Sequence, residues 1–266
     1  MKKKIVLIAT IVAIVVIIGA IVYVANTIVQ KANYKKENPV ATMEVENYGT
    51  VTIELYPEYA PNTVANFIAL ANHGFYNGLT FHRTIPEFMI QGGDKNGDGS
   101  GSASLSDLGQ EKSENENKAY NIPGEFIING FTQNTLKHTK GVISMARSDY
   151  SSYGSTTMAK KGYDSASSQF FIMTEDNASL DGLYAAFGKV TSGMDVVEKI
   201  ANVEVETREN TSSQDSNLTK DRPTNPPVIK SISVDTKGID YGMPTTVEPF
   251  DYYSYMMQQS YGGGNK

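Results

Sequence analysis

The chain has 266 residues, of which 40% are apolar and 20% charged, with a net charge of -6 and no cysteine. This composition is typical of a globular protein and allows one large domain or two small ones. The lack of cysteine excludes disulfides, cysteine-based zinc sites and thiol catalysis. The three histidines lie far apart, which argues against a histidine-rich metal site. The acidic balance argues against a general nucleic-acid binder, which needs clustered Lys and Arg.

The N-terminal segment has the pattern of a membrane anchor. Three lysines at 2–4 precede an uncharged apolar run at 5–25. As a helix, this run would span roughly 31 Å, the thickness of a bilayer's hydrocarbon core. A cleaved signal peptide is the alternative, but its apolar region would be shorter and would end in a small-x-small site.

We therefore predict a short cytoplasmic flank at 1–4, a transmembrane anchor at 5–25 and a polar linker at 26–38. Lysines lie on both sides of the run, so the positive-inside rule barely discriminates between the two orientations. The very short flank before a long folded domain favours an extracytoplasmic domain on a single-pass anchor in the cell membrane.

The next elements form a predicted β-hairpin followed by a helix. Apolar and polar residues alternate over 41–46 and 50–56, around an Asn-Tyr-Gly turn. Pro61 then opens a helical pattern with one apolar face, which Gly74 can terminate.

Most of the remaining elements are predicted to be strands. Strand patterns occur at 80–85, 88–91, 141–146, 169–174, 185–190 and 228–234. A second helix is predicted at 194–201, with Ser192 as its N-cap and Asp195 as the matching acid. Many short strands with two helices predict a mainly β fold, a closed or nearly closed barrel with helices over its ends.

Polar stretches at 100–118, 149–164 and 203–227 are predicted to be loops or insertions. The tail at 239–266 is rich in Tyr, Met and Gln and has neither helical nor strand periodicity. We predict that this tail is flexible or loosely docked.

The segment 81–94, FHRTIPEFMIQGGD, places one cation among large apolar side chains. In alternating strands Phe81 and Arg83 share a face, as do Met89 and Gln91. A guanidinium on an apolar surface needs a partner, and the amide oxygen of Gln91 could provide it. From this segment alone, a surface arginine and an active-site arginine are equally consistent.

Further motifs follow in order: GDGSG at 97–101, GEF at 124–126, KHTKG at 137–141, SMARS at 144–148, SSQFFI at 167–172, LDG at 180–182, AFGKV at 186–190, GMDVV at 193–197 and VIKSI at 228–232. With 81–94, they resemble the cyclophilin family of peptidyl-prolyl cis-trans isomerases over residues 43–234. The resemblance implies a closed eight-stranded antiparallel β-barrel capped by two α-helices, here an isomerase domain at 39–238 with three insertions.

The resemblance also implies an active site. It makes Arg83 the catalytic residue, with Gln91 orienting it. It places an apolar proline pocket at Phe88, Met89, Phe171, Leu180 and Tyr184. Ala146, Arg147 and Gln169 are expected to line the adjoining groove, where backbone groups at 146–147 would pair an extended substrate. His82 would support the wall or touch substrate, and we favour the wall. No cofactor or metal is implied.

The chemistry needs only the arginine. Rotation about an Xaa-Pro bond is slow because amide resonance imposes a barrier of about 18–20 kcal/mol. In the twisted state the prolyl nitrogen gains a lone pair that a guanidinium N–H can bond. The planar ground state offers no such lone pair, so the interaction is selective for the transition state.

Two details depart from the family or compete with it. Ser179 stands where many eukaryotic members carry Trp, so weak cyclosporin binding is expected. The loop at 94–99 matches the first half of an EF-hand, but position twelve is Leu105 instead of Glu. We therefore assign this loop to the cyclophilin pattern and not to calcium.

The sequence thus predicts a bacterial, membrane-anchored isomerase. It would act on proline-containing polypeptides among secreted or surface proteins, as a monomer and without nucleic acid. One alternative is a catalytically idle proline-peptide-binding module, which would be expected to lack Arg83, Phe88 or Gln91. Another is a surface adhesin that uses the Tyr-, Met- and Gln-rich tail.

Overall fold

The computed structural model describes residues 37–109, 117–151, 156–206 and 219–262. Contacts divide the chain after Glu37, and every element below lies in the unit 38–266. The predicted anchor at 5–25 lies outside the described residues, as does the linker up to residue 36. Within the described ranges, no helix is long and apolar enough to cross a membrane.

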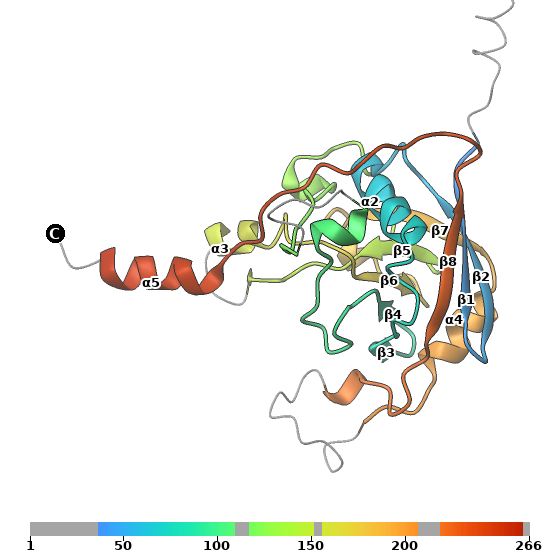
Figure 1. Cartoon of the computed structure of the whole chain (residues 1–266). Coiled ribbons are helices and arrows are strands. Elements are labelled where there is room, and N and C mark those ends of the chain that lie inside the picture. The colour runs from blue at the N-terminus through green and yellow to red at the C-terminus, as the bar shows by residue number, and fades with distance from the viewer. Residues whose placement is uncertain (1–36, 110–116, 152–155, 207–218, 263–266) are drawn as a thin grey trace, which may run out of the picture. The chain divides into compact units, whose positions relative to one another are not determined.

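Eight strands form one antiparallel sheet (Figure 1). The strands follow the order β3-β4-β6-β5-β7-β2-β1-β8. Their bounds are β1 (Val40–Val45), β2 (Gly49–Leu55), β3 (Arg83–Ile85), β4 (Met89–Gly92), β5 (Val142–Met145), β6 (Phe170–Met173), β7 (Ala186–Ser192) and β8 (Ile229–Asp235). The prediction of a mainly β fold with eight antiparallel strands is therefore confirmed.

The prediction of a closed barrel is wrong, because the edge strands β3 and β8 share no ladder in the described chain and the curled sheet stays open. Thr80, before β3, forms a single bridge with Val228, before β8. The N–H of Phe81 donates to the carbonyl of Pro227 at 2.9 Å. On the other side of the bridge, the N–H of Ile229 donates to the carbonyl of Leu79 at 2.7 Å. Pro227 has no N–H to donate, so the pairing does not continue past Phe81 toward β3.

Helix α2 (Pro61–Asn72) begins where predicted, with proline in its first turn, and its residues 63–71 are all buried, so more than the predicted apolar face is covered. Its N-cap, Ala60, offers no side-chain hydrogen bond. Instead, the carboxylate of Glu125 accepts from the N–H of Asn62 at 2.9 Å and of Thr63 at 2.7 Å. A distant side chain thus satisfies the free donors of the helix start.

Helix α4 (Met194–Ala201) has the predicted bounds but not the predicted cap. Ser192 ends β7, where it pairs with Thr52. Gly193 takes the N-cap position with a φ of 86° and no side-chain cap. A Cβ there would collide with the carbonyl oxygen of Thr50, so the turn requires glycine and the predicted capping box is wrong.

The structure contains more helices than the two that were predicted to cover the ends of the barrel. Helix α3 (Thr156–Lys161) lies in the loop predicted at 149–164, and α5 (Tyr252–Gly262) lies in the tail. Short 3-10 helices are η1 (Leu105–Leu108), η2 (Ile127–Asn129), η4 (Ala178–Leu180) and η5 (Thr219–Asp221). Before α5, Val247 forms an isolated β-bridge with Asn121, so this part of the tail contacts the domain. The flexibility of the tail stays a prediction.

Apolar side chains pack on both faces of the sheet. The main core includes Phe67 of α2, whose ring meets those of Tyr76, Phe170 and Phe187 at 5.2–5.8 Å. A second, smaller cluster includes Met89 and Phe171, packed with partly buried neighbours. This second cluster forms the floor of the candidate site.

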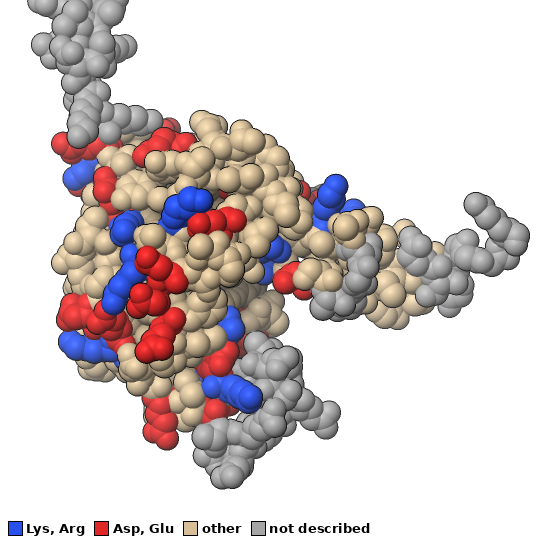
Figure 2. All heavy atoms as spheres, turned by 180° about the vertical axis from the view of Figure 1, so that it is seen from behind, with Lys and Arg blue, Asp and Glu red and all other residues tan. Residues whose placement is uncertain are grey.

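The surface carries charges of both signs. Figure 2 shows basic and acidic side chains interspersed over one face. Many are paired, for example Lys140 with Glu198 at 2.6 Å and Lys230 with Glu44 at 2.9 Å. Exposed pairs of this kind contribute little to stability.

Candidate active site

Four neighbouring strands align the central side chains of the site. Arg83 of β3 pairs with Gln91 of β4, which pairs with Phe171 of β6, which pairs with Ser144 of β5. Directly paired residues point to the same face of a sheet. The β-register therefore brings the cation, the amide and the aromatic ring into one row.

A small cavity of about 130 Å³ opens over this row. Met89 and Phe171 are buried in its floor, at 2% and 6% exposure. The volume is below the usual range for drug-sized ligands and suits one small ring. All nine lining residues are among those predicted: Arg83, Phe88, Met89, Gln91, Ala146, Arg147, Phe171, Leu180 and Tyr184.

Arg83 is held mainly by a residue that the sequence did not point to. Its Nε donates to Oδ2 of Asp221 at 3.2 Å, and its Nη2 lies 3.2 Å from the same oxygen. The predicted partner, Gln91, accepts from Nη1 at 3.5 Å, the limit of a useful bond. Asp221 lies in the segment predicted to be an insertion at 203–227, and that segment has no sequence pattern that marks it as part of a site.

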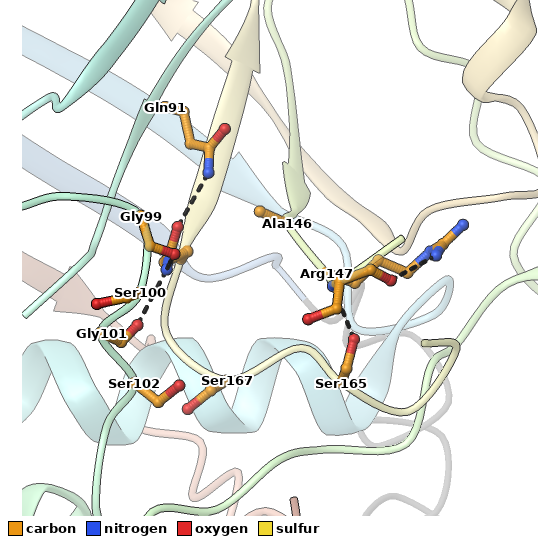
Figure 3. Close-up of a pocket in the computed structure, with 11 residues that line it drawn as sticks. Gln91, Gly99, Ser100, Gly101, Ser102, Ala146, Arg147, Ser165 and Ser167 are labelled. Carbon is orange, nitrogen blue, oxygen red and sulfur yellow. Dashed lines mark hydrogen bonds between the residues drawn. The ribbon is translucent and has the colours of Figure 1, made fainter. Parts of the chain in front are cut away.

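A chain of amides leads away from the cavity. The Gln91 amide nitrogen donates to the side-chain oxygen of Gln169 at 2.9 Å. Gln169 in turn donates to the carbonyls of Gly99 at 3.0 Å and Gly101 at 2.9 Å (Figure 3). This chain fixes the orientation of the Gln91 amide and ties the glycine loop to β4 and β6.

The amide chain also borders a second, polar cavity of about 270 Å³. It shares Gln91, Ala146 and Arg147 with the first cavity and includes Gln169. Its other walls come from the glycine loop and from serines of two further loops (Figure 3). The two cavities together form a groove with an apolar end and a polar end.

Arg147 is fixed by its surroundings. Its Nε donates to the carbonyl of Leu183 at 3.0 Å, and its guanidinium lies 4.6 Å from the ring centre of Tyr184. In Figure 3 the side chain points away from Gln91. The N–H of Ala146 already donates to the carbonyl of Gln169 at 2.9 Å, so this donor is not free for the expected pairing with substrate.

His138 supports the floor from behind and was not among the predicted site residues. Its ring stacks on that of Phe171, with centroids 6.0 Å apart and planes at 16°. Nδ1 lies 3.2 Å from Asp181 and Nε2 lies 3.1 Å from Ser144. Burial lowers the pKa of His138, although Asp181 opposes the shift. His138 belongs to the KHTKG motif, but the motif alone does not show that this ring packs behind the site. That placement depends on the pairing of β5 with β6, which sets Ser144 opposite Phe171.

His82 lines neither of these cavities. It is 4% exposed, and neither ring nitrogen has a hydrogen-bond partner among the described residues. Burial lowers its pKa, against the nearby Asp94. The supporting role that we favoured for His82 stays a prediction.

The carboxylate of Asp94 serves its own loop. Oδ2 accepts from the N–H of Asp98 at 2.7 Å and of Gly99 at 2.6 Å. These bonds shape the glycine loop beside the groove. They use the carboxylate that an EF-hand would offer first to calcium.

The family model described as cyclophilin type peptidyl-prolyl cis-trans isomerase/CLD matches residues 40–234. Peptidyl-prolyl cis-trans isomerase B of Bacillus subtilis is 38% identical over 161 residues, which are 60% of this chain and 90% of that protein. A peptidyl-prolyl cis-trans isomerase of Acinetobacter baylyi is 41% identical over 166 residues, covering 60% of this chain and 71% of that protein.

The match covers only a small part of some longer relatives. Peptidyl-prolyl cis-trans isomerase-like 2 of Rhizopus delemar is 35% identical over 210 residues, which are 79% of this chain but 29% of that protein. Among solved structures, a Cryptosporidium parvum cyclophilin type isomerase, crystallised in the presence of the dipeptide Ala-Pro, matches with a TM-score of 0.55 and 26% identity. That match covers 74% of this chain and 98% of the other.

Proposed function

The chain belongs to the cyclophilin family of peptidyl-prolyl cis-trans isomerases, and we propose that it accelerates Xaa-Pro rotation by presenting Arg83 to the twisted amide. The observation that carries this proposal is the placement of the Arg83 cation at the edge of a small cavity floored by Met89 and Phe171. The floor accepts the proline ring, and the guanidinium faces the bond that must rotate.

The cavity contributes to substrate binding, and the arginine contributes to stabilisation of the transition state. Apolar contacts bind the ring in both isomers, so they contribute uniform binding. The guanidinium bonds the prolyl nitrogen only when that nitrogen has left the amide plane, so its contribution belongs to the transition state. No proton transfer or nucleophile is required, which agrees with a site built from arginine, amides and apolar side chains.

Isomerisation of an Xaa-Pro test peptide, with and without the Arg83→Ala substitution, tests the proposal. We expect the chain to accelerate isomerisation and the substitution to reduce kcat/KM about a hundredfold, the usual effect of removing one transition-state donor. Equal rates for the two proteins would favour the rival proposal, an idle proline-peptide-binding module.

We further propose that the isomerase domain works outside the cell membrane on secreted or surface proteins. The support is the apolar run at 5–25 behind three lysines, with a polar segment between it and the domain. Xaa-Pro bonds in unfolded chains populate the cis isomer, and cis and trans interconvert slowly. A foldase held at the membrane would meet such chains as they emerge.

A further inference from the structure

The insertion at 203–227 carries a carboxylate onto the proposed catalytic arginine. Oδ2 of Asp221 accepts from Nε of Arg83 at 3.2 Å and lies 3.2 Å from Nη2. The two residues are 138 positions apart, so the contact depends on the fold and not on local sequence. Their side chains are 33% (Arg83) and 25% (Asp221) exposed, which places the pair at the rim of the cavity.

Asp221 makes the stronger of the two contacts to the guanidinium. The Gln91 oxygen lies 3.5 Å from Nη1, where a hydrogen bond is weak. The Gln91 nitrogen is engaged by Gln169 at 2.9 Å, so the amide cannot turn toward Arg83 without losing that bond. A carboxylate at 3.2 Å adds a charge-assisted contact that Gln91 cannot supply.

The segment that carries Asp221 is tied down immediately after it. The N–H of Glu206 donates to the carbonyl of Arg222 at 2.7 Å, and the N–H of Thr224 donates to the carbonyl of Glu204 at 2.9 Å. These bonds close the base of the insertion. Helix η5, which ends at Asp221, lies next to β3 (orange in Figure 1). The carboxylate is therefore presented from an anchored position.

We propose that Asp221 is a positioning residue that holds the Arg83 guanidinium for the twisted prolyl amide; this inference rests on the proposed function. Asp221 takes the Nε–Nη2 edge of the fork and leaves the other N–H groups for Gln91 and substrate. Arginine has many rotamers, and holding its planar fork removes most of that freedom. The opposing effect, a weaker positive potential, is screened because the pair is partly exposed.

The test compares Asp221→Ala and Asp221→Asn with the wild-type chain in an exchange assay that separates kcat from KM. Asp221→Ala removes the acceptor, and we expect kcat to fall about threefold with KM nearly unchanged. Asp221→Asn keeps an acceptor oxygen, so we expect its kcat to lie between those of the wild-type and Ala proteins. Asp240→Asn, an exposed carboxylate far along the chain, is the matched control and should match the wild-type rate.

Several results would overturn the inference. An Asp221→Ala rate equal to or above wild type would show that the carboxylate does not assist Arg83. A change in KM alone would place Asp221 against substrate instead. If circular dichroism shows that Asp221→Ala is unfolded, the test rests on Asp221→Asn. An unchanged kcat in Asp221→Asn would then reject a role for the ion pair in catalysis. An inactive wild-type chain would instead reject the proposed function itself.

Discussion

At the residue scale, His138 links the floor of the site to stability. Burial lowers its pKa below the ordinary value of 6.5. The unfolded chain therefore binds a proton at a higher pH than the folded chain does. The stabilisation from neutral His138 is fully present above pH 6.5 and is lost as the pH falls from there through the folded pKa. The shift of His82 is also downward, from the same cause, and adds an effect of the same sign.

We expect the free energy of unfolding to fall as the pH drops from about 7 to about 5, and to fall less steeply in His138→Gln. Urea denaturation at several pH values measures both slopes. His73 is exposed, so His73→Gln is the control for loss of an imidazole outside the core, and His138→Gln should flatten the slope more than this control does. A His138→Gln slope equal to that of wild type would contradict this assignment.

The sequence predicted the cavity-lining residues but not what holds them. Arg83, Gln91 and Phe171 lie in motifs, and strand alternation puts them on one face once the strands pair. Asp221 and His138 depend on tertiary placement. Asp221 lies in an aperiodic segment that was predicted to be an insertion. The stacking of His138 on Phe171 follows from packing that no local pattern encodes.

At the element scale, α2 depends on a carboxylate from another part of the chain. Glu125 is 4% exposed and accepts from the backbone of Asn62 and Thr63 and from the Thr63 hydroxyl at 2.7 Å. Since Ala60 provides no cap, removal of Glu125 leaves these donors unsatisfied. The GEF motif at 124–126 therefore stabilises the start of a helix packed on the sheet.

We expect Glu125→Ala to lower the free energy of unfolding by about 2–4 kcal/mol, through lost capping bonds and buried unsatisfied donors. The control Glu58→Ala removes an exposed carboxylate near α2 and should cost less than about 0.5 kcal/mol. Chemical denaturation measures both values. Equal stabilities of the two variants would contradict the capping role.

Strands and helices were predictable to different degrees. Alternation over 41–56 predicted the β1–β2 hairpin, and Pro61 with Gly74 bounded α2. The strand predicted at 80–85 is shorter because only 83–85 pairs in a ladder. Helices α3 and α5 lie in polar or aperiodic segments, where composition predicted loops and local contacts decide the structure.

At the scale of the whole molecule, the apolar run at 5–25 is predicted to be a membrane anchor. We expect the full chain to stay with membranes after a carbonate wash, because about twenty apolar residues suffice to span a bilayer. A chain lacking residues 1–25 is the control and should be released. Recovery of the full chain in the wash would contradict anchoring.

If Arg83 acts on the twisted amide and not on substrate binding, its removal should change the rate far more than the affinity, and one experiment can measure both. Exchange spectroscopy on one Xaa-Pro peptide gives both for the wild-type chain and Arg83→Ala. We expect the catalysed rate to fall about a hundredfold while the peptide Kd changes far less, because the lost bond exists only in the transition state. Unchanged catalysis, or a rate loss fully explained by a weaker Kd, would contradict the account.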